Sequence, residues 1–261
     1  MEAQVRIIQA SKSDDYSNAS HPTIFHELLN SDLPPEEKSM HRLVYEGQGL
    51  VGAGTITTAH TLKTISFHLL ANPATLEKVK KELSETEPDL ANNIPLQRLE
   101  QLPYLSAVIN EGLRLGLGVS TRLQRIAPDR ALTFHDWVIP PGTPVSMSSM
   151  FMHHNAEVFP ASHEWRPERW LEDNAMQRLD KYLVPFSKGT RACLGMNLAY
   201  AELYLSIAAV FRHFDLELYH TTRDDIETAH DFVNPFPRFD SNGLRVTVKS
   251  VKGLATRQEA S

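Results

Sequence analysis

The chain has 261 residues, 41% of them hydrophobic and 22% charged, which is ample for a sizeable core in one large domain or two small ones. Its net charge of −6 argues against nucleic-acid binding, and its single cysteine, Cys193, excludes an internal disulfide and suits a reducing compartment. No stretch approaches the roughly 18 apolar residues of a membrane span, and the first residues lack the apolar region of a signal peptide. As written, the chain is expected to be soluble and intracellular.

The hydrophobic spacing predicts a mainly helical domain over residues 1–261, with a small β part. Residues 1–33 are expected to be a partly loop-like lead-in. From Pro34 to Asn72 apolar or small residues recur every three or four positions, which predicts one unusually long helix that crosses the whole domain. Two shorter helices are expected to follow, over about residues 74–85 and 104–115.

The second half of the chain is expected to be more irregular. Three short strand-like pieces are expected, over residues 122–127, 132–135 and 145–148. A stretch rich in proline follows over residues 150–192. Helix is expected to return at Cys193 and to run to about Phe214, with core contacts from Leu198, Leu205, Ala209 and Phe211. The tail reads as a terminal hairpin of residues 215–219 and 244–251.

The cysteine lies in the segment FSKGTRACLG, residues 186–195. Phe186 could shield a metal-bound sulfur, while Gly189 and Gly195 would let backbone approach a ligand where a Cβ would clash. Arg191 offers a permanent charge that matches a carboxylate, and a helix start at Cys193 would favour the thiolate. A lone cysteine is more often a buried packing residue, but the constrained F-x-x-G-x-R-x-C-x-G pattern favours a thiolate ligand.

Two further patterns are informative together with this loop. Glu111 and Arg114 lie three apart on an apolar helix, so they could form a partly buried pair with Arg169 as a further partner, although most such pairs are solvated. In the long helix, Gly52-Ala53-Gly54 precedes three threonines, Thr55, Thr57 and Thr58. Such poor helix formers indicate either room for a flat ligand or a close helix crossing.

The remaining candidates are weaker. Arg125, in the first strand-like piece, could reach a cofactor carboxylate, although local evidence favours an ordinary solvated strand arginine. The pair His153-His154 reads as part of a surface loop. The sequence contains no H-E-x-x-H, no G-x-S-x-G and no Walker loop, and the G-x-G of the long helix follows no strand, which excludes a dinucleotide loop.

Taken in order, the motifs resemble the C-terminal half of the cytochrome P-450 family of haem-thiolate monooxygenases. The matching pieces are A-G-x-x-T at residues 53–57, E-x-x-R at 111–114, P-E-R-W at 167–170 and the cysteine loop at 186–195. The segments P-E-R-W-L-E and I-P-P-G-T-P-V are similar to fungal members of secondary metabolism. The resemblance covers nearly all of this chain, but family members run to roughly twice its length.

This resemblance implies roles for individual residues. Haem b would be ligated by the Cys193 thiolate, with Arg125 and Arg191 on its propionates and Ala53 and Gly54 beside it. Thr57 would help to deliver protons to dioxygen, and Glu111, Arg114 and Arg169 would form a structural network behind the haem. Val119, Ser120 and Thr121 would face a small apolar substrate. Electrons would come from an NADPH-dependent reductase, and family members are typically anchored to the endoplasmic reticulum membrane.

Two departures from the family pattern qualify these implications. Ile56 occupies the position before the threonine where the family usually has an acidic residue, which predicts either weaker coupling of oxygen reduction to product or chemistry that needs no such proton relay. The N-terminal anchor and the lid helices of the family have no counterpart in the sequence, so the chain alone is expected to hold haem poorly. Two alternatives therefore accompany the monooxygenase, namely a non-catalytic remnant and a helical interaction protein whose motifs are vestiges.

Overall fold

The computed structural model describes residues 3, 5–6, 23–173 and 178–253. The chain divides into two compact units, Met1–Ile56 and Thr57–Ser261, and the boundary lies within the long helix α3 (Met40–Ala71). Ala53 and Gly54 therefore belong to the first unit, and Thr57 begins the second. A single domain over residues 1–261 stays a prediction.

In the first unit the predicted long helix begins later than expected. A short 3-10 turn, η2 (Pro35–Lys38), comes first, and α3 starts only at Met40 because Ser39 adopts an extended backbone with φ −63° and ψ 151°. The lead-in contains one more helix, α2 (Ile24–Asn30). Thr23 caps it through a bond from its amide to the His26 ring, a local device that hydrophobic spacing does not reveal.

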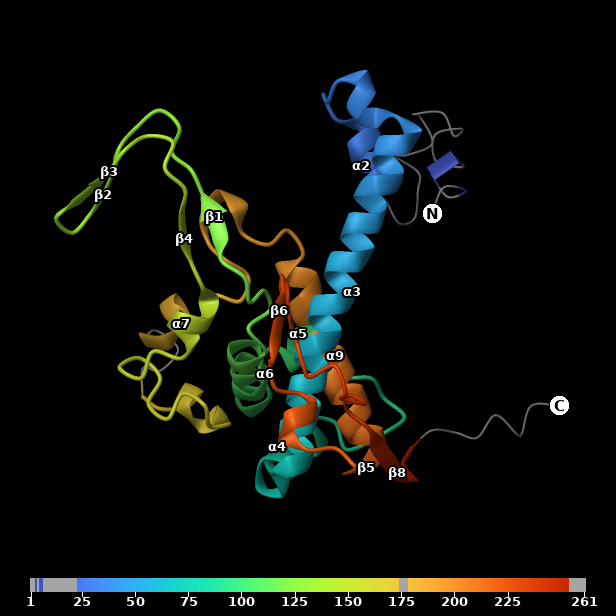
Figure 1. Ribbon diagram of the computed structural model, residues 1–261. Coiled ribbons are helices and arrows are strands. Elements are labelled where there is room, and N and C mark those ends of the chain that lie inside the picture. The colour runs from blue at the N-terminus through green and yellow to red at the C-terminus, as the bar shows by residue number, and fades with distance from the viewer. Residues whose placement is uncertain (1–2, 4, 7–22, 174–177, 254–261) are drawn as a thin grey trace. The chain divides into compact units, whose positions relative to one another are not determined.

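The second unit has its core around the helix α6 (Pro103–Gly116), most of whose residues are buried. The end of α3 and the helices α4 (Pro73–Thr86) and α9 (Met196–His213) pack against it, and Figure 1 shows the path of the chain through these helices. Ile65, Leu105 and Phe211 are almost completely buried in this core. Two short helices complete the set, α5 (Leu96–Leu99) and α7 (Ser149–His153).

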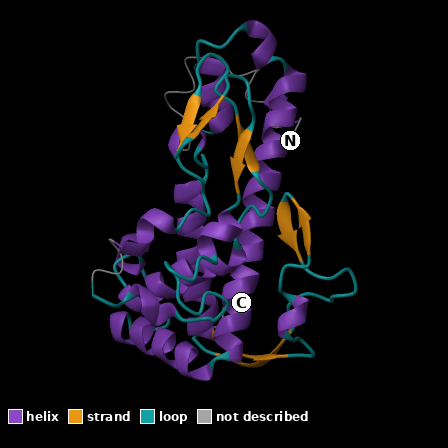
Figure 2. Cartoon of the chain, turned by 60° about the vertical axis from the view of Figure 1, so that its left-hand side comes forward, coloured by secondary structure: helices purple, strands orange, loops and turns teal. Residues whose placement is uncertain are grey.

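The β part consists of four separate two-stranded antiparallel ladders (Figure 2). They pair β1 (Leu123–Arg125) with β4 (Val145–Met147), β2 (Leu132–Phe134) with β3 (Trp137–Ile139), β5 (Phe214–Leu218) with β8 (Val246–Val251), and β6 (His230–Phe232) with β7 (Asn234–Phe236). The expected terminal hairpin is therefore wrong in its connection, since the β6–β7 hairpin separates its two strands. Strand β3 was not expected. It follows β2 after a tight turn in which His135 has φ +51°.

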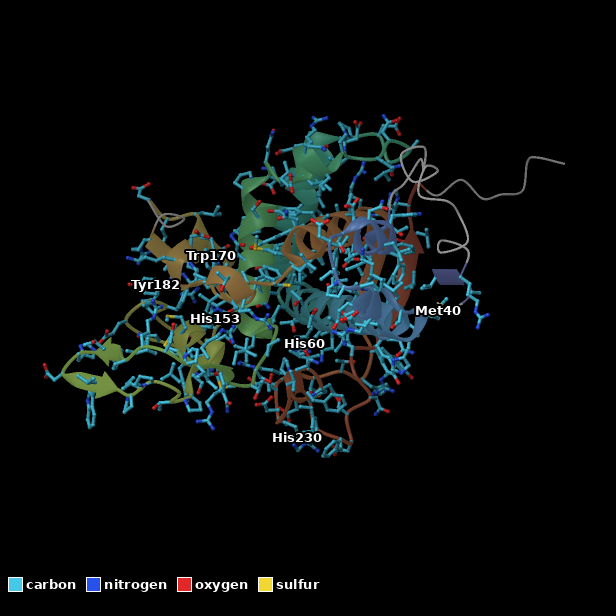
Figure 3. The ribbon with its side chains drawn as sticks, turned by 90° about the horizontal axis from the view of Figure 1, so that it is seen from above. Met40, His60, His153, Trp170, Tyr182 and His230 are labelled. Carbon is cyan, nitrogen blue, oxygen red and sulfur yellow. The ribbon has the colours of Figure 1, made fainter. Side chains whose placement is uncertain are left out.

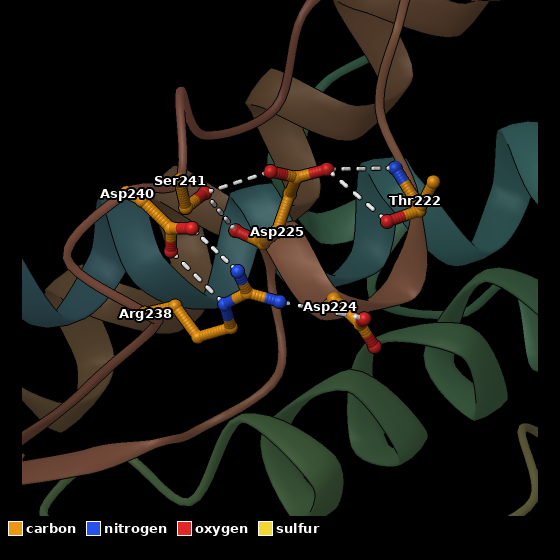
Figure 4. A pocket seen from close by; sticks show the side chains of 6 residues that line it. All are labelled: Thr222, Asp224, Asp225, Arg238, Asp240 and Ser241. Atoms are coloured by element: carbon orange, nitrogen blue, oxygen red, sulfur yellow. Dashed lines mark hydrogen bonds and ion pairs between the residues drawn. The ribbon is translucent and has the colours of Figure 1, made fainter.

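A polar pocket lies where the two ends of the segment that carries the β6–β7 hairpin come together (Figure 4). The Asp225 carboxylate accepts bonds from the Thr222 amide at 2.9 Å and from the Ser241 hydroxyl at 3.1 Å. Arg238 pairs with Asp240 beside them. These contacts hold the two ends of the segment 222–241 together, so both ends of the segment that carries the hairpin start from the same place on the unit.

Over residues 150–173 and 178–192 the chain is irregular apart from α7, the helical residues 178–179 and three 3-10 turns, η3 (Pro167–Trp170), η4 (Asp180–Tyr182) and η5 (Gly189–Arg191). Helix returns at Met196 rather than at Cys193, with Gly195 as its N-cap. The predicted core face of α9 is also wrong in part. Leu198, Leu205 and Ala209 are exposed, because the helix turns Leu203, Ile207 and Phe211 inward.

Candidate functional site

The Glu111 carboxylate is completely buried and is surrounded by five hydrogen-bond donors. One oxygen accepts from Arg114 Nη2 at 2.8 Å, from Arg169 Nε at 3.1 Å and from the Arg166 amide at 3.0 Å. The other accepts from Arg114 Nε at 2.9 Å and from Trp170 Nε1 at 3.0 Å. A carboxylate with every lone-pair direction occupied is the arrangement that makes a buried charge tolerable.

Backbone carbonyl groups satisfy the rest of the two guanidinium groups. Arg114 donates to the carbonyls of His153, Ser162 and Glu164, at 2.9, 2.6 and 3.2 Å. Arg169 donates to those of Pro160 and Ala161, at 2.9 and 3.4 Å. Two cations and one anion leave a net positive charge, which these carbonyl dipoles offset. The network thereby holds the irregular stretch 153–170 against α6.

The cysteine loop is closed by one main-chain bond. The Cys193 amide donates to the Phe186 carbonyl at 2.8 Å, so the loop turns back on itself over eight residues. This amide is paired and the helix starts three residues later, so the predicted unpaired helix terminus at Cys193 is wrong. The Phe186 ring is half-buried and packs 5.2 Å from the Tyr200 ring on α9. The turn η5 and the paired amide, rather than a helix dipole, set the position of the thiol.

The surface of this loop that carries Cys193 and Arg191 is exposed. Cys193, Arg191 and every other residue from 188 to 198 are exposed. No heavy atom of the described residues lies within 4 Å of a Cβ built on Gly189 or Gly195, the two chain neighbours of each apart. Gly189 has φ +77°, which an L side chain rarely adopts. The loop therefore presents a thiol, a guanidinium group and the apolar side chain of Leu194, which is 81% exposed, on one unobstructed stretch.

Thr57 lies at the start of the second unit, in a part of α3 that is unusually rich in threonine. Its carbonyl accepts a bond from the Thr61 hydroxyl at 3.1 Å, in addition to its place in the helix. Thr64 makes the same bond to the His60 carbonyl at 3.0 Å. Hydroxyl groups that bond one turn back in this way bend and loosen a helix locally.

Ser120 has a buried and hydrogen-bonded side chain. Its hydroxyl donates to Asp231 Oδ1 at 2.8 Å and its amide to the Val233 carbonyl at 3.0 Å, which joins it to the β6–β7 hairpin. Val119 and Thr121 on either side are half-buried. Of the three residues predicted to face substrate, Ser120 thus carries a structural bond as well.

Arg125 is exposed on β1, and the structure pairs its guanidinium group with the neighbouring Gln124 carbonyl at 2.9 Å. It stays a candidate for an acidic group on a ligand. No group of three or more histidine, cysteine, aspartate and glutamate side chains in the described ranges could hold a bare metal ion. Over the same ranges no helix is both long and apolar enough to cross a bilayer.

His153 is the functional candidate that the sequence reading missed. The prediction of a surface pair is wrong for it, because its side chain is 0% exposed and both ring nitrogens are hydrogen-bonded (Figure 3). Burial lowers the pKa of the ring to about 3. One signal was present in the sequence, since the preceding residues Met150–Met152 and the later Val158-Phe159 are apolar and favour a packed turn.

Comparison with known proteins agrees with this geometry. The family "Cytochrome P450" matches residues 3–241. A cytochrome P450 monooxygenase of Ascocoryne sarcoides is 48% identical over 93% of this chain and 48% of its own length. A tryptophan 6-hydroxylase of Fusarium equiseti is 49% identical, over 95% and 49% respectively. An N-acetyltryptophan 6-hydroxylase of Emericella nidulans is 49% identical, over 87% and 45%.

The chain thus spans about half the length of the curated relatives it matches. Its helical fold with small antiparallel ladders is that of part of the family fold. On the match over residues 3–241 and on these identities, the chain belongs to the cytochrome P450 family of fungal secondary metabolism.

Proposed function

We propose that this chain carries the haem-binding half of a monooxygenase that inserts one oxygen atom from O2 into a small apolar molecule. The family implies haem, O2 and a redox partner. The observation that carries the proposal is the exposed Cys193 thiol, on a loop closed by its own backbone. The activity, substrate and partners of the whole protein are proposed here, because the relatives are twice as long.

The residues of the loop fit a haem group. A thiolate is a preferred ligand of haem iron, and Cys193 is the single thiol in the sequence. The open space over Gly189 and Gly195 admits a flat ring, which exposed Leu194 and Leu198 would cover with apolar surface. Arg191 and Arg125 would bind the propionates. Phe186 would shield the sulfur from water.

Haem, when bound, supplies the activation of dioxygen that the protein alone lacks. The chain's own residues would hold protons and substrate around it. The Thr57 hydroxyl would accept and pass a proton, and the bond from the Thr61 hydroxyl to the Thr57 carbonyl supports this role because such bonds tend to bend a helix locally. Ile56, which precedes it, has no group that can do so. We infer that proton delivery here depends on the threonine and on water rather than on a side-chain acid.

The substrate class is supported by the names of two relatives, which hydroxylate tryptophan and N-acetyltryptophan. An indole-bearing molecule would meet the apolar requirement. Val119, Ser120 and Thr121 would line its site from the segment that follows α6. Electrons would come from an NADPH-dependent reductase. The whole protein would be attached to the endoplasmic reticulum membrane, as members of the family typically are.

The proposal is tested by ligation. The protein is loaded with haem and reduced under carbon monoxide, and its absorption spectrum is compared with that of Cys193→Ser. We expect a thiolate-ligated band that the serine variant loses, while Ser187→Ala, in the same loop, retains it. An unchanged band in Cys193→Ser would contradict the assignment of the ligand.

A second candidate is a member of the family that binds haem poorly and does not turn over. The observation that favours it is the exposure of large apolar side chains, including Met147 at 79%, Phe151 at 76% and Trp137 at 74%. Such surfaces normally mark a site that something else covers. Purified protein that shows no haem band, or only a nitrogen-ligated one, would support this candidate over the monooxygenase.

A further inference from the structure

His153 connects two parts of the second unit that bear on the cysteine loop. Its Nδ1 lies 3.0 Å from the Arg114 carbonyl oxygen at the end of α6. Its Nε2 lies 2.9 Å from the Val184 amide nitrogen, which precedes the loop. A backbone amide can only donate, so Nε2 must be the acceptor and Nδ1 must carry the proton. The geometry thus selects one neutral tautomer that bonds at both ends.

The bond to Val184 is two residues from the loop. The Val184 carbonyl accepts from the Ser187 amide at 3.1 Å, and the Phe186 carbonyl accepts from the Cys193 amide at 2.8 Å. A second contact lies beside the first. A Cβ on Gly118, just after α6, would come within 3.0 Å of the Pro185 carbonyl oxygen, so the two backbones are in direct contact there. The start of the loop is therefore held to the end of α6 at two adjacent points.

The ring stays neutral where it lies. Burial lowers its pKa to about 3, and the nearby positive charge of Arg114 acts in the same direction. Arg114 also donates to the His153 carbonyl at 2.9 Å, so the backbone and the ring of this residue are both fixed by α6. A doubly protonated ring would point a second donor at the Val184 amide, which the arrangement disfavours.

We propose that His153 is a positioning residue for Cys193, a neutral strut that holds the base of the cysteine loop against α6. The proposal rests on the proposed role of Cys193 as the iron ligand. It goes beyond the buried Glu111 network, because that network holds residues 153–170 and makes no bond to the loop in the described parts of the chain. His153 is the residue through which that network reaches Val184.

Two variants separate the two ends of the strut. In His153→Gln the amide group can reach the position of Nε2 and accept from Val184, whereas in His153→Asn it can reach only the position of Nδ1 and bond to Arg114. Ser149→Ala is the matched control. It removes a bond of 2.9 Å between α7 and the Val119 carbonyl, in the same region, and leaves Val184 untouched.

The readouts are amide hydrogen exchange of the haem-free protein and the thiolate-ligated fraction of the haem-loaded protein under carbon monoxide. We expect His153→Asn to speed exchange at Val184 and Cys193 about tenfold and to lower the thiolate-ligated fraction at constant haem content. His153→Gln is expected to restore most of both, and Ser149→Ala to change neither. Equal behaviour of the glutamine and asparagine variants, or an asparagine variant with the original spectrum, would overturn the proposal.

The Cys193→Ser spectrum separates this failure from failure of the proposed function. If serine abolishes the thiolate-ligated band and His153→Asn leaves it intact, only the strut is refuted. If serine leaves the band intact, Cys193 is not the ligand and both proposals fall. Should His153→Asn not fold, His153→Gln against the unaltered protein still decides, because a loss of the thiolate band there despite a protected Val184 amide would contradict the strut.

Discussion

At the scale of single residues, the buried charged side chains around Glu111 are the feature that most distinguishes this chain. Glu111 is one negative charge that two buried arginines share, and every one of its donors comes from α6 or from the stretch 166–170. A carboxylate so placed stabilises the fold mainly because its removal would leave two cations without a counter-charge in a region of low dielectric.

Glu111→Gln is expected to lower the free energy of unfolding by about 3–5 kcal/mol, because it strands the Arg114 and Arg169 charges in the core. Urea unfolding measures this. Glu172→Gln is the matched control, since Glu172 also pairs with two arginines, Arg166 and Arg178, but at the surface. That variant should lose less than about 1 kcal/mol. Equal losses would show that burial does not govern the Glu111 network.

Ile56→Asp tests the proposed proton path. A carboxylate beside Thr57 would supply the missing relay, so a smaller fraction of the NADPH consumed should appear as hydrogen peroxide. The measurement is peroxide released per NADPH oxidised. Thr55→Asp, which adds the same charge one position earlier on the exposed part of α3, should leave the ratio as it was. No fall in peroxide with Ile56→Asp would rule out the relay as the limiting feature.

At the scale of elements, α6 carries two glycines one turn apart on the side that faces α3, and only Gly112 makes a close approach there. Gly112 packs against α3 so closely that an added Cβ would lie 2.1 Å from Ile65 Cγ1. Gly116 also faces α3, but there the nearest atoms, the hydroxyl oxygens of Thr61 and Thr64, would be at 3.7 Å. The close crossing fixes where α6 lies against α3, and with it the position of the Glu111 network.

The same substitution should therefore have opposite effects at the two glycines. Gly112→Ala is expected to destabilise the fold by about 1–3 kcal/mol, because the buried Ile65 must move. Gly116→Ala meets only ordinary contacts and should be neutral or stabilise by up to about 1 kcal/mol through helix propensity. Thermal unfolding of both variants checks this. In the double variant Ile65→Ala with Gly112→Ala, the effects should be less than additive.

Much of this element scale could be predicted from sequence, within limits that have physical causes. The helices around Lys80 and Val108 follow from local spacing and were placed to within one or two residues. The start of α9 was missed because Leu194 lies four residues before Leu198, so the apolar helical spacing continues across the turn at Gly195. The inward face of α9 was misjudged because an apolar residue such as Leu198 does not say which neighbour will cover it.

At the scale of the whole molecule, four histidines are held neutral by burial. The pKa of His153 is lowered to about 3, and those of His60, His68 and His154 to about 4, in each case mainly by desolvation. In the unfolded chain these rings titrate near 6.5. Between about pH 6.5 and 4 the unfolded state therefore binds more protons than the folded state.

The free energy of unfolding should accordingly be highest above about pH 6.5 and fall as the pH is lowered toward 4. The slope is about 1.4 kcal/mol per pH unit for each fully buried histidine that titrates, with a smaller share from half-exposed His154. Urea unfolding at several pH values measures it. His153→Gln should reduce the slope, because it removes one of the buried rings. A flat profile over this range would contradict the buried state of these rings.

Sequence alone determined the family to which the chain belongs, since one cysteine among glycines, an E-x-x-R pair and a threonine-rich helix are local patterns that can be recognised without coordinates. Tertiary structure alone decided that five donors meet at Glu111, that Gly112 rather than Gly116 sets the approach of α6 to α3, and that His153 is buried between Arg114 and Val184. Apart from the two bonds from Arg114 to Glu111, those facts depend on residues that are 31 to 59 positions apart in the chain. Spacing along the sequence reports which side a residue faces, and only packing reports what it meets there.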